Sequence, residues 1–391
     1  MSESLQTKFG RRQLLARAGA VMAIGALPGC GGSPVARRPA EIGFRPIRAS
    51  VDRISQISVC TRPFRAKGPR LDVERIGQKT VVHNYGHGGS GWSLSWGSSA
   101  IAVDKAMSSG EREIAVVGCG ALGLTSALLL QRAGAKVTIY AKELPPHVPS
   151  SFASGLWTPD SRICFEEHAT AEFKQSWEQM ARTSWGIHHK SLGLPGTPVE
   201  FIDSYFVSDD PGPRRRRVEA DGRPAFAELQ HELLSDLTPA GVDFPPGTHT
   251  LGPHHLRRKA QLMFNIHGYS QMLMQDFRSA GGRVEIAEFH TPNDFAKIRE
   301  QTLIHATGYG ARALFDDPSL TPVRGQVART APQPDIHYRL LYRGVSFVPR
   351  RDGLVFQVIG DDDYYGFADD TAQPDHAEAE HAVHTIAELF A

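Results

Sequence analysis

The sequence has 391 residues and a formal net charge close to zero, with 43 Lys and Arg residues against 42 Asp and Glu residues. A chain of this length can form two packed domains with enough interior for a large cofactor. The balanced charge provides no overall field that would attract nucleic acid, and the 4 cysteines are too scattered for a disulfide framework or a zinc site. We therefore expect a protein of enzyme size without a nucleic-acid partner or a metal.

Residues 1–30 have the pattern of an export signal. Arg11 and Arg12 form a twin-arginine pair, and a weakly apolar stretch follows that ends in Leu27-Pro28-Gly29-Cys30, similar to a lipobox. Gly10, Leu14 and Pro28 depart from the usual residues of such signals, and a disordered basic tail is the alternative. We expect export by the twin-arginine machinery to the periplasm or to a membrane anchor, with lipidation of Cys30 left open. Residues 31–40 have the composition of a tether.

Residues 114–140 follow the pattern of a dinucleotide-binding fold. Ile114–Gly118 is a β-branched run typical of a buried parallel strand, a helix is expected over Leu124–Ala133, and a second strand over Lys136–Tyr140. Between the first strand and the helix, Gly118 permits a tight turn, Gly120 lets a pyrophosphate approach the backbone, and Gly123 lets helix and strand pack closely. Leu122, in the same turn, is a further candidate for cofactor contact.

The end of the second strand departs from the usual motif. An Asp or Glu at this point normally accepts hydrogen bonds from a ribose, but Lys142 occupies the position here. Either Glu143 takes over this role from the next position, or the backbone alone holds the ribose. Lys142 remains a candidate for cofactor contact.

Seven segments of the chain resemble the D-amino-acid oxidase family. They are, in chain order, Gly43–Arg48 (the family's G-F-R-P-V-R), His83–Ser93 (H-N-Y-G-H-G-G-Y-G-L-T), Ser150–Pro159 (A-A-G-L-W-Q-P), Leu303–Gly308 (A-T-G or C-T-G), Pro322–Val327 (R-G-Q-I), Val345–Pro349 (P-Y-I-I-P) and Gly353–Gln357 (G-G-I-F-Q). The resemblance implies FAD as the cofactor. It also implies an α/β fold in which an FAD-binding Rossmann-like domain is joined to an antiparallel-sheet substrate domain.

The order of these segments predicts a circular permutation. Gly43–Arg48 and His83–Ser93 belong near the family's C-terminus but precede the dinucleotide motif here, and Ser108–Arg112 would be the joining linker. Such a rearrangement is tolerated where the native ends lie close together. We expect substrate-domain segments at 41–79, mainly at 160–255, and at 323–391 with a C-terminal helix, and FAD-domain segments at 80–107, 108–159 (the Rossmann core) and 256–322.

The resemblance also assigns roles to individual residues. Arg45 would clamp a substrate carboxylate with its guanidinium fork, Tyr342 would assist it, and Ser346 stands where the family has a second tyrosine, which would enlarge the pocket. The implied flavin contacts outside the dinucleotide turn are Gly88, Gly89, Gly91, Trp92, Ser93, Ser150, Gly155, Leu156, Thr307 and Gly308.

The leading interpretation is an exported FAD-dependent oxidase that removes a hydride from the Cα of an amino acid or related amine, with oxygen as the acceptor. A flavin dehydrogenase with another acceptor and a non-catalytic FAD-binding lipoprotein are the alternatives. Twin-arginine export of folded proteins suits a flavin inserted in the cytoplasm. The Arg214–Arg217 run is expected to be a solvated loop, the scattered histidine pairs lack metal-ligand spacing, and Cys119 is expected to be a packing residue.

Overall fold

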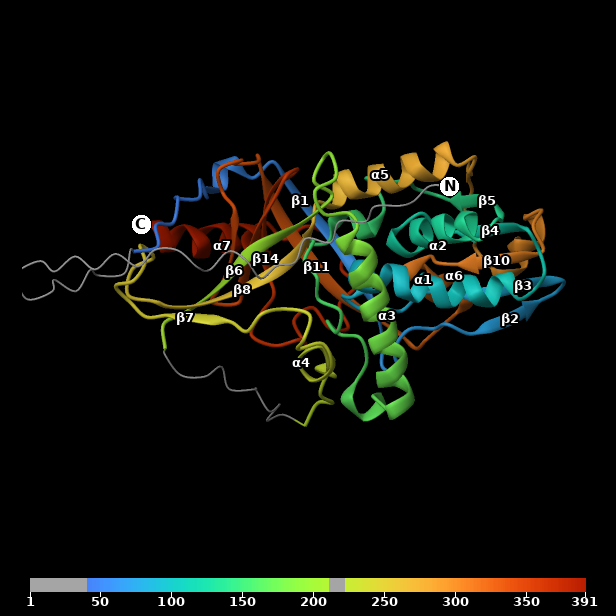
Figure 1. Ribbon diagram of the computed structural model, residues 1–391, viewed down its shortest axis with the longest axis horizontal. Helices are drawn as coiled ribbons and strands as arrows, with labels where there is room; N and C mark the ends of the chain where they lie inside the picture. The colour runs from blue at the N-terminus through green and yellow to red at the C-terminus, as the bar shows by residue number, and fades with distance from the viewer. Residues whose placement is uncertain (1–40, 211–221) are drawn as a thin grey trace, which may run out of the picture. The chain divides into compact units, whose positions relative to one another are not determined.

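Two β-sheets organise the part of the chain that the structure describes, which is residues 41–210 and 222–391 (Figure 1). The structure is a computed structural model. The predicted export signal and tether, with Cys30, lie outside the described residues, and so does the Arg214–Arg217 run.

The first sheet contains the dinucleotide motif. Its six strands lie in the order β2 (Val73–Ile76), β3 (Lys79–His83), β10 (Thr302–His305), β4 (Glu113–Val117), β5 (Lys136–Ala141) and β9 (Arg283–Ile286). All neighbours are parallel except β2, which runs antiparallel to β3. The predicted strand, helix and second strand appear as β4, α2 (Ala121–Arg132) and β5.

Both faces of this sheet are covered, as expected for parallel strands with apolar residues at successive positions. In β4, Ile114 and Val116 pack into a core shared with helices α1 (Gly91–Met107), α2, α3 (Ala171–His189) and α5 (Ile266–Ser279). Ala115 and Val117 point to the opposite face and pack with Phe295 and Leu314, the latter on the short helix α6 (Ala311–Phe315).

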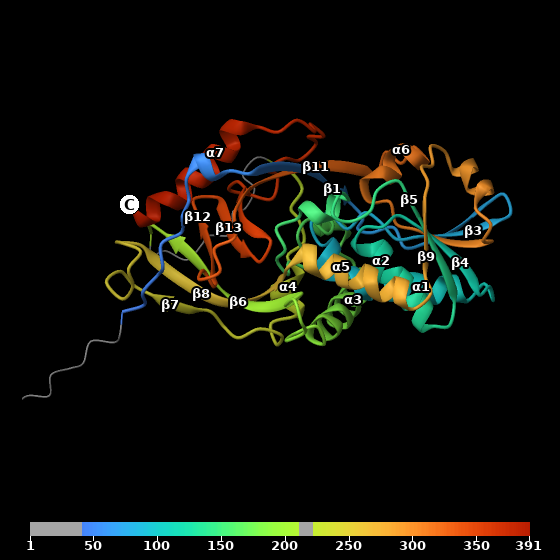
Figure 2. The same ribbon diagram turned by 90° about the horizontal axis from the view of Figure 1, so that it is seen from above.

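The second sheet is mostly antiparallel. Its eight strands lie in the order β1 (Gln56–Arg65), β11 (Leu320–Thr330), β14 (Gly353–Val358), β13 (Val345–Arg350), β12 (Tyr338–Tyr342), β6 (Val199–Ser208), β8 (His255–Phe264) and β7 (Val242–Phe244). Only the β6–β12 pair is parallel. Helix α7 (His376–Ala387) packs on one face of this sheet together with Phe44 and Ile47. The remaining α-helix of the described residues is the short α4 (Leu229–Leu233). Figure 2 shows α7 along β12 and β13.

The predicted fold class, a Rossmann-like domain joined to an antiparallel-sheet domain, is confirmed. Two of the expected segment boundaries differ from the sheets. Val73–Ile76 lies in the six-stranded sheet although we assigned residues 41–79 to the substrate domain, because it pairs with β3. His255–Phe264 lies in the eight-stranded sheet although 256–322 was assigned to the FAD domain, because it pairs along its whole length with β6.

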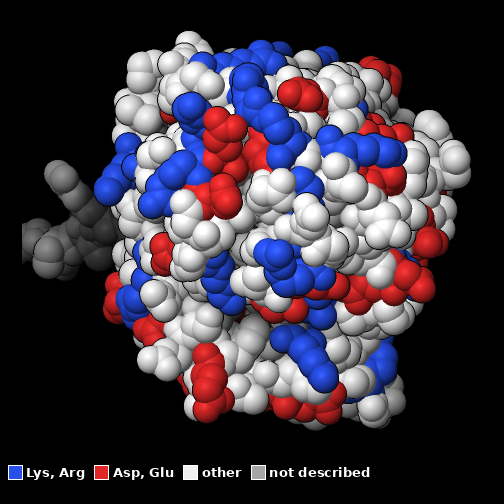
Figure 3. All heavy atoms as spheres, turned by 90° about the vertical axis from the view of Figure 1, so that its right-hand side faces the viewer, with Lys and Arg blue, Asp and Glu red and all other residues white. Residues whose placement is uncertain are grey.

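Figure 3 shows the face at the right-hand side of Figure 1, where basic and acidic side chains are interspersed. Ion pairs of this kind occur on the six-stranded sheet, where Glu113 pairs with both Lys136 and Arg299. Among the described residues, none of the helices combines the length and the apolar composition that crossing a membrane would require.

Candidate cofactor and substrate site

A large cavity opens where the carboxyl ends of the parallel strands meet the eight-stranded sheet. Its volume is about 1960 Å³, whereas a site for one small molecule usually measures about 300–1,000 Å³. The cavity therefore has room for a cofactor and a substrate together. One part of its wall follows strands β4, β5 and β10 of the six-stranded sheet, and the other follows strands β1 and β12–β14 of the eight-stranded sheet.

The glycine turn after β4 forms the wall at which a dinucleotide would lie. Gly118 has a positive φ of 109°, and a Cβ there would come within 2.4 Å of the Ala306 carbonyl oxygen. At Gly123 a Cβ would come within 2.1 Å of the Gly118 carbonyl oxygen, so α2 can approach β4 only because both residues are glycine. The positive N-terminal end of α2, which begins in this turn, is suited to a pyrophosphate.

The loop after β5 and the start of α1 are joined beside this turn. The Trp92 indole N–H donates to the Ser150 carbonyl over 2.8 Å, and the Ser150 hydroxyl accepts from the Ala121 N–H over 3.2 Å. Three segments that are far apart in the sequence therefore meet at one point of the cavity wall. We expected this convergence around a flavin from the family resemblance.

The glycine turn provides the test of whether the cavity fits a dinucleotide. A Cβ at Gly120, on the cavity wall, would come within 3.2 Å of the Ser150 hydroxyl, so this residue leaves room that a side chain would fill. His87 lies beside this site, but its side chain is buried in the protein. Its Nε2 lies 2.7 Å from the Ser98 hydroxyl, which donates its proton to Asn84 Oδ1, so His87 Nε2 is the donor. Burial lowers the pKa of His87 to about 3, so the ring is neutral, and its Nδ1 is enclosed by protein without a hydrogen-bond partner among the described residues.

Most of the cofactor contacts expected from the sequence lie on the cavity wall. They are Gly88, Gly89, Gly91, Trp92, Gly118, Gly120, Leu122, Lys142, Ser150, Leu156, Thr307 and Gly308. Lys142 and Glu143 both line the cavity, and Lys142 Nζ lies 3.7 Å from a Glu288 carboxylate oxygen, so the question of the ribose contact stays open.

Three expected cofactor contacts do not reach the cavity, and each has another role. Gly123 lies behind the turn, where it lets α2 pack against β4. Gly155 has a φ of 92° and passes next to the Phe264 carbonyl, while its neighbours Ser154 and Leu156 face the cavity. The Ser93 hydroxyl is fully buried and accepts from the Thr158 N–H over 2.8 Å, so it ties α1 to the loop instead of facing the cofactor.

Arg45, which we predicted to bind the substrate carboxylate, does not lie in the cavity. The Arg45 side chain is 68% exposed, pairs with Asp335 over 3.3 Å, and is absent from the cavity wall, because the neighbouring Phe44 anchors this segment on the outer face of the eight-stranded sheet. Tyr342 packs in the same outer core, and its hydroxyl donates to Asp209 over 3.3 Å. Of the three proposed substrate residues, only Ser346 lines the cavity.

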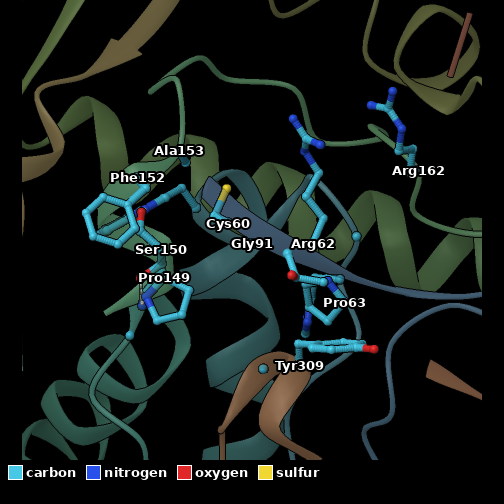
Figure 4. Close-up of a pocket in the computed structure, with 18 of the residues that line it drawn as sticks. Cys60, Arg62, Pro63, Gly91, Pro149, Ser150, Phe152, Ala153, Arg162 and Tyr309 are labelled. Atoms are coloured by element: carbon cyan, nitrogen blue, oxygen red, sulfur yellow. Dashed lines mark hydrogen bonds between the residues drawn. The ribbon is translucent and has the colours of Figure 1, made fainter. Parts of the chain in front are cut away.

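The arginine that does face the cavity is Arg62, which sequence reasoning missed. Figure 4 shows the Arg62 and Cys60 side chains on the same side of β1, with the Arg162 guanidinium beyond them. Arg62 donates to the Arg324 carbonyl over 2.8 Å, and among the described residues it forms no ion pair. Its sequence signal is the run Arg62-Pro63-Phe64-Arg65, which repeats the Arg-Pro-x-Arg spacing of Arg45–Arg48.

A second guanidinium shares this part of the cavity. Arg162 is buried, and desolvation lowers its pKa to about 10, with the nearby charge of Arg62 acting in the same direction. It pairs with Asp363 over 3.2 Å. The side chains of Ser346 and Gln357, which are register neighbours on β13 and β14, continue the polar floor of the cavity. The arrangement can hold an anion next to the cofactor wall.

Comparisons with known proteins agree with this assignment of the cavity. The family model described as FAD dependent oxidoreductase matches residues 113–391. A D-amino-acid oxidase from Streptomyces coelicolor is 30% identical over 226 residues, which are 58% of this chain and 61% of that protein. A D-amino-acid oxidase from Rubrobacter xylanophilus is 28% identical over 216 residues, or 55% of this chain and 58% of that protein.

The chain thus spans less than two thirds of the length of these relatives. Among solved structures, the iminodiacetate oxidase from Chelativorans sp. BNC1 is similar with a TM-score of 0.45 and 14% identity, over 71% of this chain and 80% of that one.

Proposed function

Since this chain belongs to the FAD dependent oxidoreductase family, we propose that it oxidises the Cα–N bond of an amino acid or related amine, with oxygen as the electron acceptor. FAD supplies the acceptor for the hydride that leaves Cα. The protein supplies the position of the substrate and the electrostatic environment. The observation that carries the proposal is Arg62, a guanidinium without an acidic partner among the described residues, on the same cavity wall as the dinucleotide turn.

In this proposal Arg62 binds the substrate carboxylate. A guanidinium fork matches a carboxylate with two parallel hydrogen bonds, and one N–H of Arg62 is already held by the Arg324 carbonyl, which fixes the direction of the fork. The carboxylate also relieves the repulsion between Arg62 and Arg162. With its carboxylate fixed, the substrate can turn its Cα hydrogen toward the flavin.

The backbone around Gly88–Trp92 would hold the flavin itself. Helix α1 begins at Gly91, which lies on the cavity wall, so the positive end of this helix would lie near a bound flavin and would stabilise negative charge that develops on it during reduction. This placement follows the family resemblance and the positions of Gly88, Gly89 and Gly91 on the cavity wall.

Anaerobic mixing with a panel of D- and L-amino acids and simple amines tests the proposal. We expect the flavin absorbance to bleach with at least one carboxylate-bearing substrate and to return on admission of air. Bleaching without rapid return would support a dehydrogenase with another acceptor. Absence of bleaching with the whole panel would leave a non-catalytic FAD-binding protein as the better interpretation.

We further propose export by the twin-arginine route, which rests on Arg11 and Arg12 and on the lipobox-like ending at Cys30. Cell fractionation of the wild-type chain and of the R11K/R12K variant tests this. The wild type is expected outside the cytoplasm and the variant inside it. Equal cytoplasmic accumulation of both would contradict the proposal, and metabolic labelling with a fatty acid would decide whether Cys30 is lipidated.

Finally, we propose that the chain is circularly permuted relative to its family. The family model begins at Glu113, immediately after the linker Ser108–Arg112, and leaves residues 41–112 unmatched. Those residues nevertheless supply β1 to the eight-stranded sheet and β2, β3 and α1 to the other domain. They complete both domains, as the displaced C-terminal part of a permuted family member would.

A further inference from the structure

Four polar side chains form a continuous hydrogen-bonded line from the protein surface to the cofactor cavity. Glu74 Oε2 on β2 lies 3.0 Å from His83 Nε2 on β3. His83 Nδ1 lies 3.0 Å from His305 Nδ1 on β10. His305 Nε2 lies 2.6 Å from the Thr307 hydroxyl oxygen. Glu74 is 40% exposed at one end, and Thr307 lines the cavity at the other.

The two histidines are fixed by the sheet. His83 and His305 are register partners in the parallel β3–β10 pair, and both are fully buried. The rings of Tyr85 and Phe315 pack against both of them, and Phe295 packs against His305. Imidazole rings enclosed in this way cannot rotate freely, so each nitrogen keeps one partner.

The charged groups near Glu74 determine which groups donate and which accept at the surface end of this line. Arg70 donates to the same oxygen of Glu74 that faces His83, over 2.8 Å, and also to Asp72 and to the Tyr85 hydroxyl. The Tyr85 hydroxyl in turn donates to Asp317. Arg70 is a donor only, so this oxygen of Glu74 is held as an acceptor for both neighbours.

The proton positions follow from this acceptor. Burial lowers the pKa of His83 and lowers that of His305 further, so both rings are neutral and each carries one N–H. His83 Nε2 must donate to the carboxylate, which leaves a lone pair on His83 Nδ1. His305 Nδ1 must therefore donate to His83, and its Nε2 must accept the proton of the Thr307 hydroxyl. Every donor in the line points away from the cavity.

We infer that Glu74, His83 and His305 are positioning residues that fix the Thr307 hydroxyl as a hydrogen-bond acceptor for FAD. A free threonine hydroxyl can donate or accept, but the proton of Thr307 is committed to His305, and only its lone pairs face the cavity. The group that it binds must therefore be a hydroxyl or N–H of the cofactor. A pyrophosphate oxygen, which only accepts, would meet a lone pair there and is excluded from this contact.

The experiment measures how tightly the holoenzyme keeps FAD, from the fluorescence of flavin released on dilution. T307V removes the hydroxyl and keeps the shape, T307S keeps the hydroxyl, E74L removes the outer acceptor, and E74Q keeps it, because Arg70 holds the amide oxygen toward His83. One hydrogen bond corresponds to about threefold to tenfold in the dissociation constant. We expect that increase for T307V and E74L, and values near the wild type for T307S and E74Q.

The double variant E74L/T307V distinguishes positioning from a structural role. If Glu74 acts through the Thr307 hydroxyl, the double variant will be no weaker than T307V alone. Additive losses, or an E74Q variant as weak as E74L, would overturn the inference, since Glu74 would then act through its charge or its packing. An unchanged T307V variant would also overturn it. The proposed oxidation would survive that result, because flavin bleaching by substrate tests it separately.

Discussion

At the scale of single residues, we predict opposite effects on substrate binding when Arg62 and Arg45 are substituted. We expect R62L to raise KM for a carboxylate-bearing substrate by at least about tenfold, because a hydrogen-bonded guanidinium–carboxylate pair is worth more than a neutral hydrogen bond. R45L should leave KM unchanged, since the Arg45 side chain lies at the surface beside Asp335. Steady-state kinetics of the two variants under identical conditions decide between them. A large rise in KM for R45L and none for R62L would instead support the sequence-based expectation that Arg45 binds the substrate carboxylate.

We expect substitution of His87 to lower stability. The ring is buried, and its Nε2 hydrogen-bonds the Ser98 hydroxyl over 2.7 Å. H87A removes the ring and this hydrogen bond and leaves a cavity, so the thermal midpoint should fall by several degrees. H87Q, whose side-chain amide can reach Ser98, should recover part of the loss. Thermal unfolding followed by circular dichroism gives the measurement, and an H87A midpoint equal to that of the wild type would contradict this expectation.

These two residues show what sequence reasoning could and could not find. The motif around Gly86 drew attention to its glycines, but the orientation of the His87 ring depends on Ser98, whose hydroxyl accepts from His87 and donates to Asn84, and only the three-dimensional contacts reveal this. We did not identify Arg62 from the sequence, because its Arg-Pro-x-Arg run lacks the preceding Gly-Phe that makes Arg45 match the family segment.

At the scale of elements, the error at Tyr342 has a physical cause. In a strand, alternate residues face opposite sides of the sheet, so Arg339 and Leu341 face the cavity while Leu340 and Tyr342 face the core under α7. All residues of β12 are buried, so no alternation of polar and apolar residues indicates which of them face the cavity and which face the core. A shift of one position in assigning faces therefore cannot be detected from this strand's composition.

Gly325 lies on β11 opposite β1, and its substitution should change substrate binding without a large change in thermal stability. A Cβ at Gly325 would lie 2.6 Å from the Arg62 guanidinium, whose flexible end can move aside. We expect G325A to displace the guanidinium, raising KM for the carboxylate substrate while the thermal midpoint stays within a few degrees of the wild type, about the shift of 1 kcal/mol or less. G97A is the contrast, because its Cβ would meet the Met180 backbone at 2.1 Å and should lower the midpoint. A G325A variant that unfolds readily with normal KM would contradict this interpretation.

At the scale of the whole molecule, the dinucleotide half was predictable and the substrate half was not. The motif from Ile114 to Tyr140 is local, and its strand, turn and helix recur with bounds shifted by only a few residues. The order of the eight-stranded sheet depends on pairings between distant segments, such as β1 with β11 and β6 with β12. No local pattern encodes those pairings, so the position of the first described residues relative to the cavity was predicted wrongly.

The circular permutation is the prediction that involves the whole chain. Ile42 and Phe390 pack against the same hydrophobic core, and in Figures 1 and 2 the blue start of the described chain lies at the same end as the C-terminus. The Ser109 hydroxyl, in the proposed linker, bonds to Thr302 over 3.0 Å, so α1 ends beside the first residues of β4 and β10. A chain opened at Ser109, with Ala391 joined to Glu41 by a short flexible linker, should therefore keep the native contacts of both sheets.

We expect this rearranged chain to be soluble, to bind FAD, and to match the wild type in its flavin spectrum and in its substrate-dependent bleaching. Opening the chain instead within α2, with the same join, is the matched control and should abolish flavin binding, because α2 packs directly behind the dinucleotide turn. If the chain opened at Ser109 were insoluble or free of flavin under conditions in which the wild type folds, the two ends of the described part would not be the natural joining point. The order of the family segments would then need another explanation than permutation.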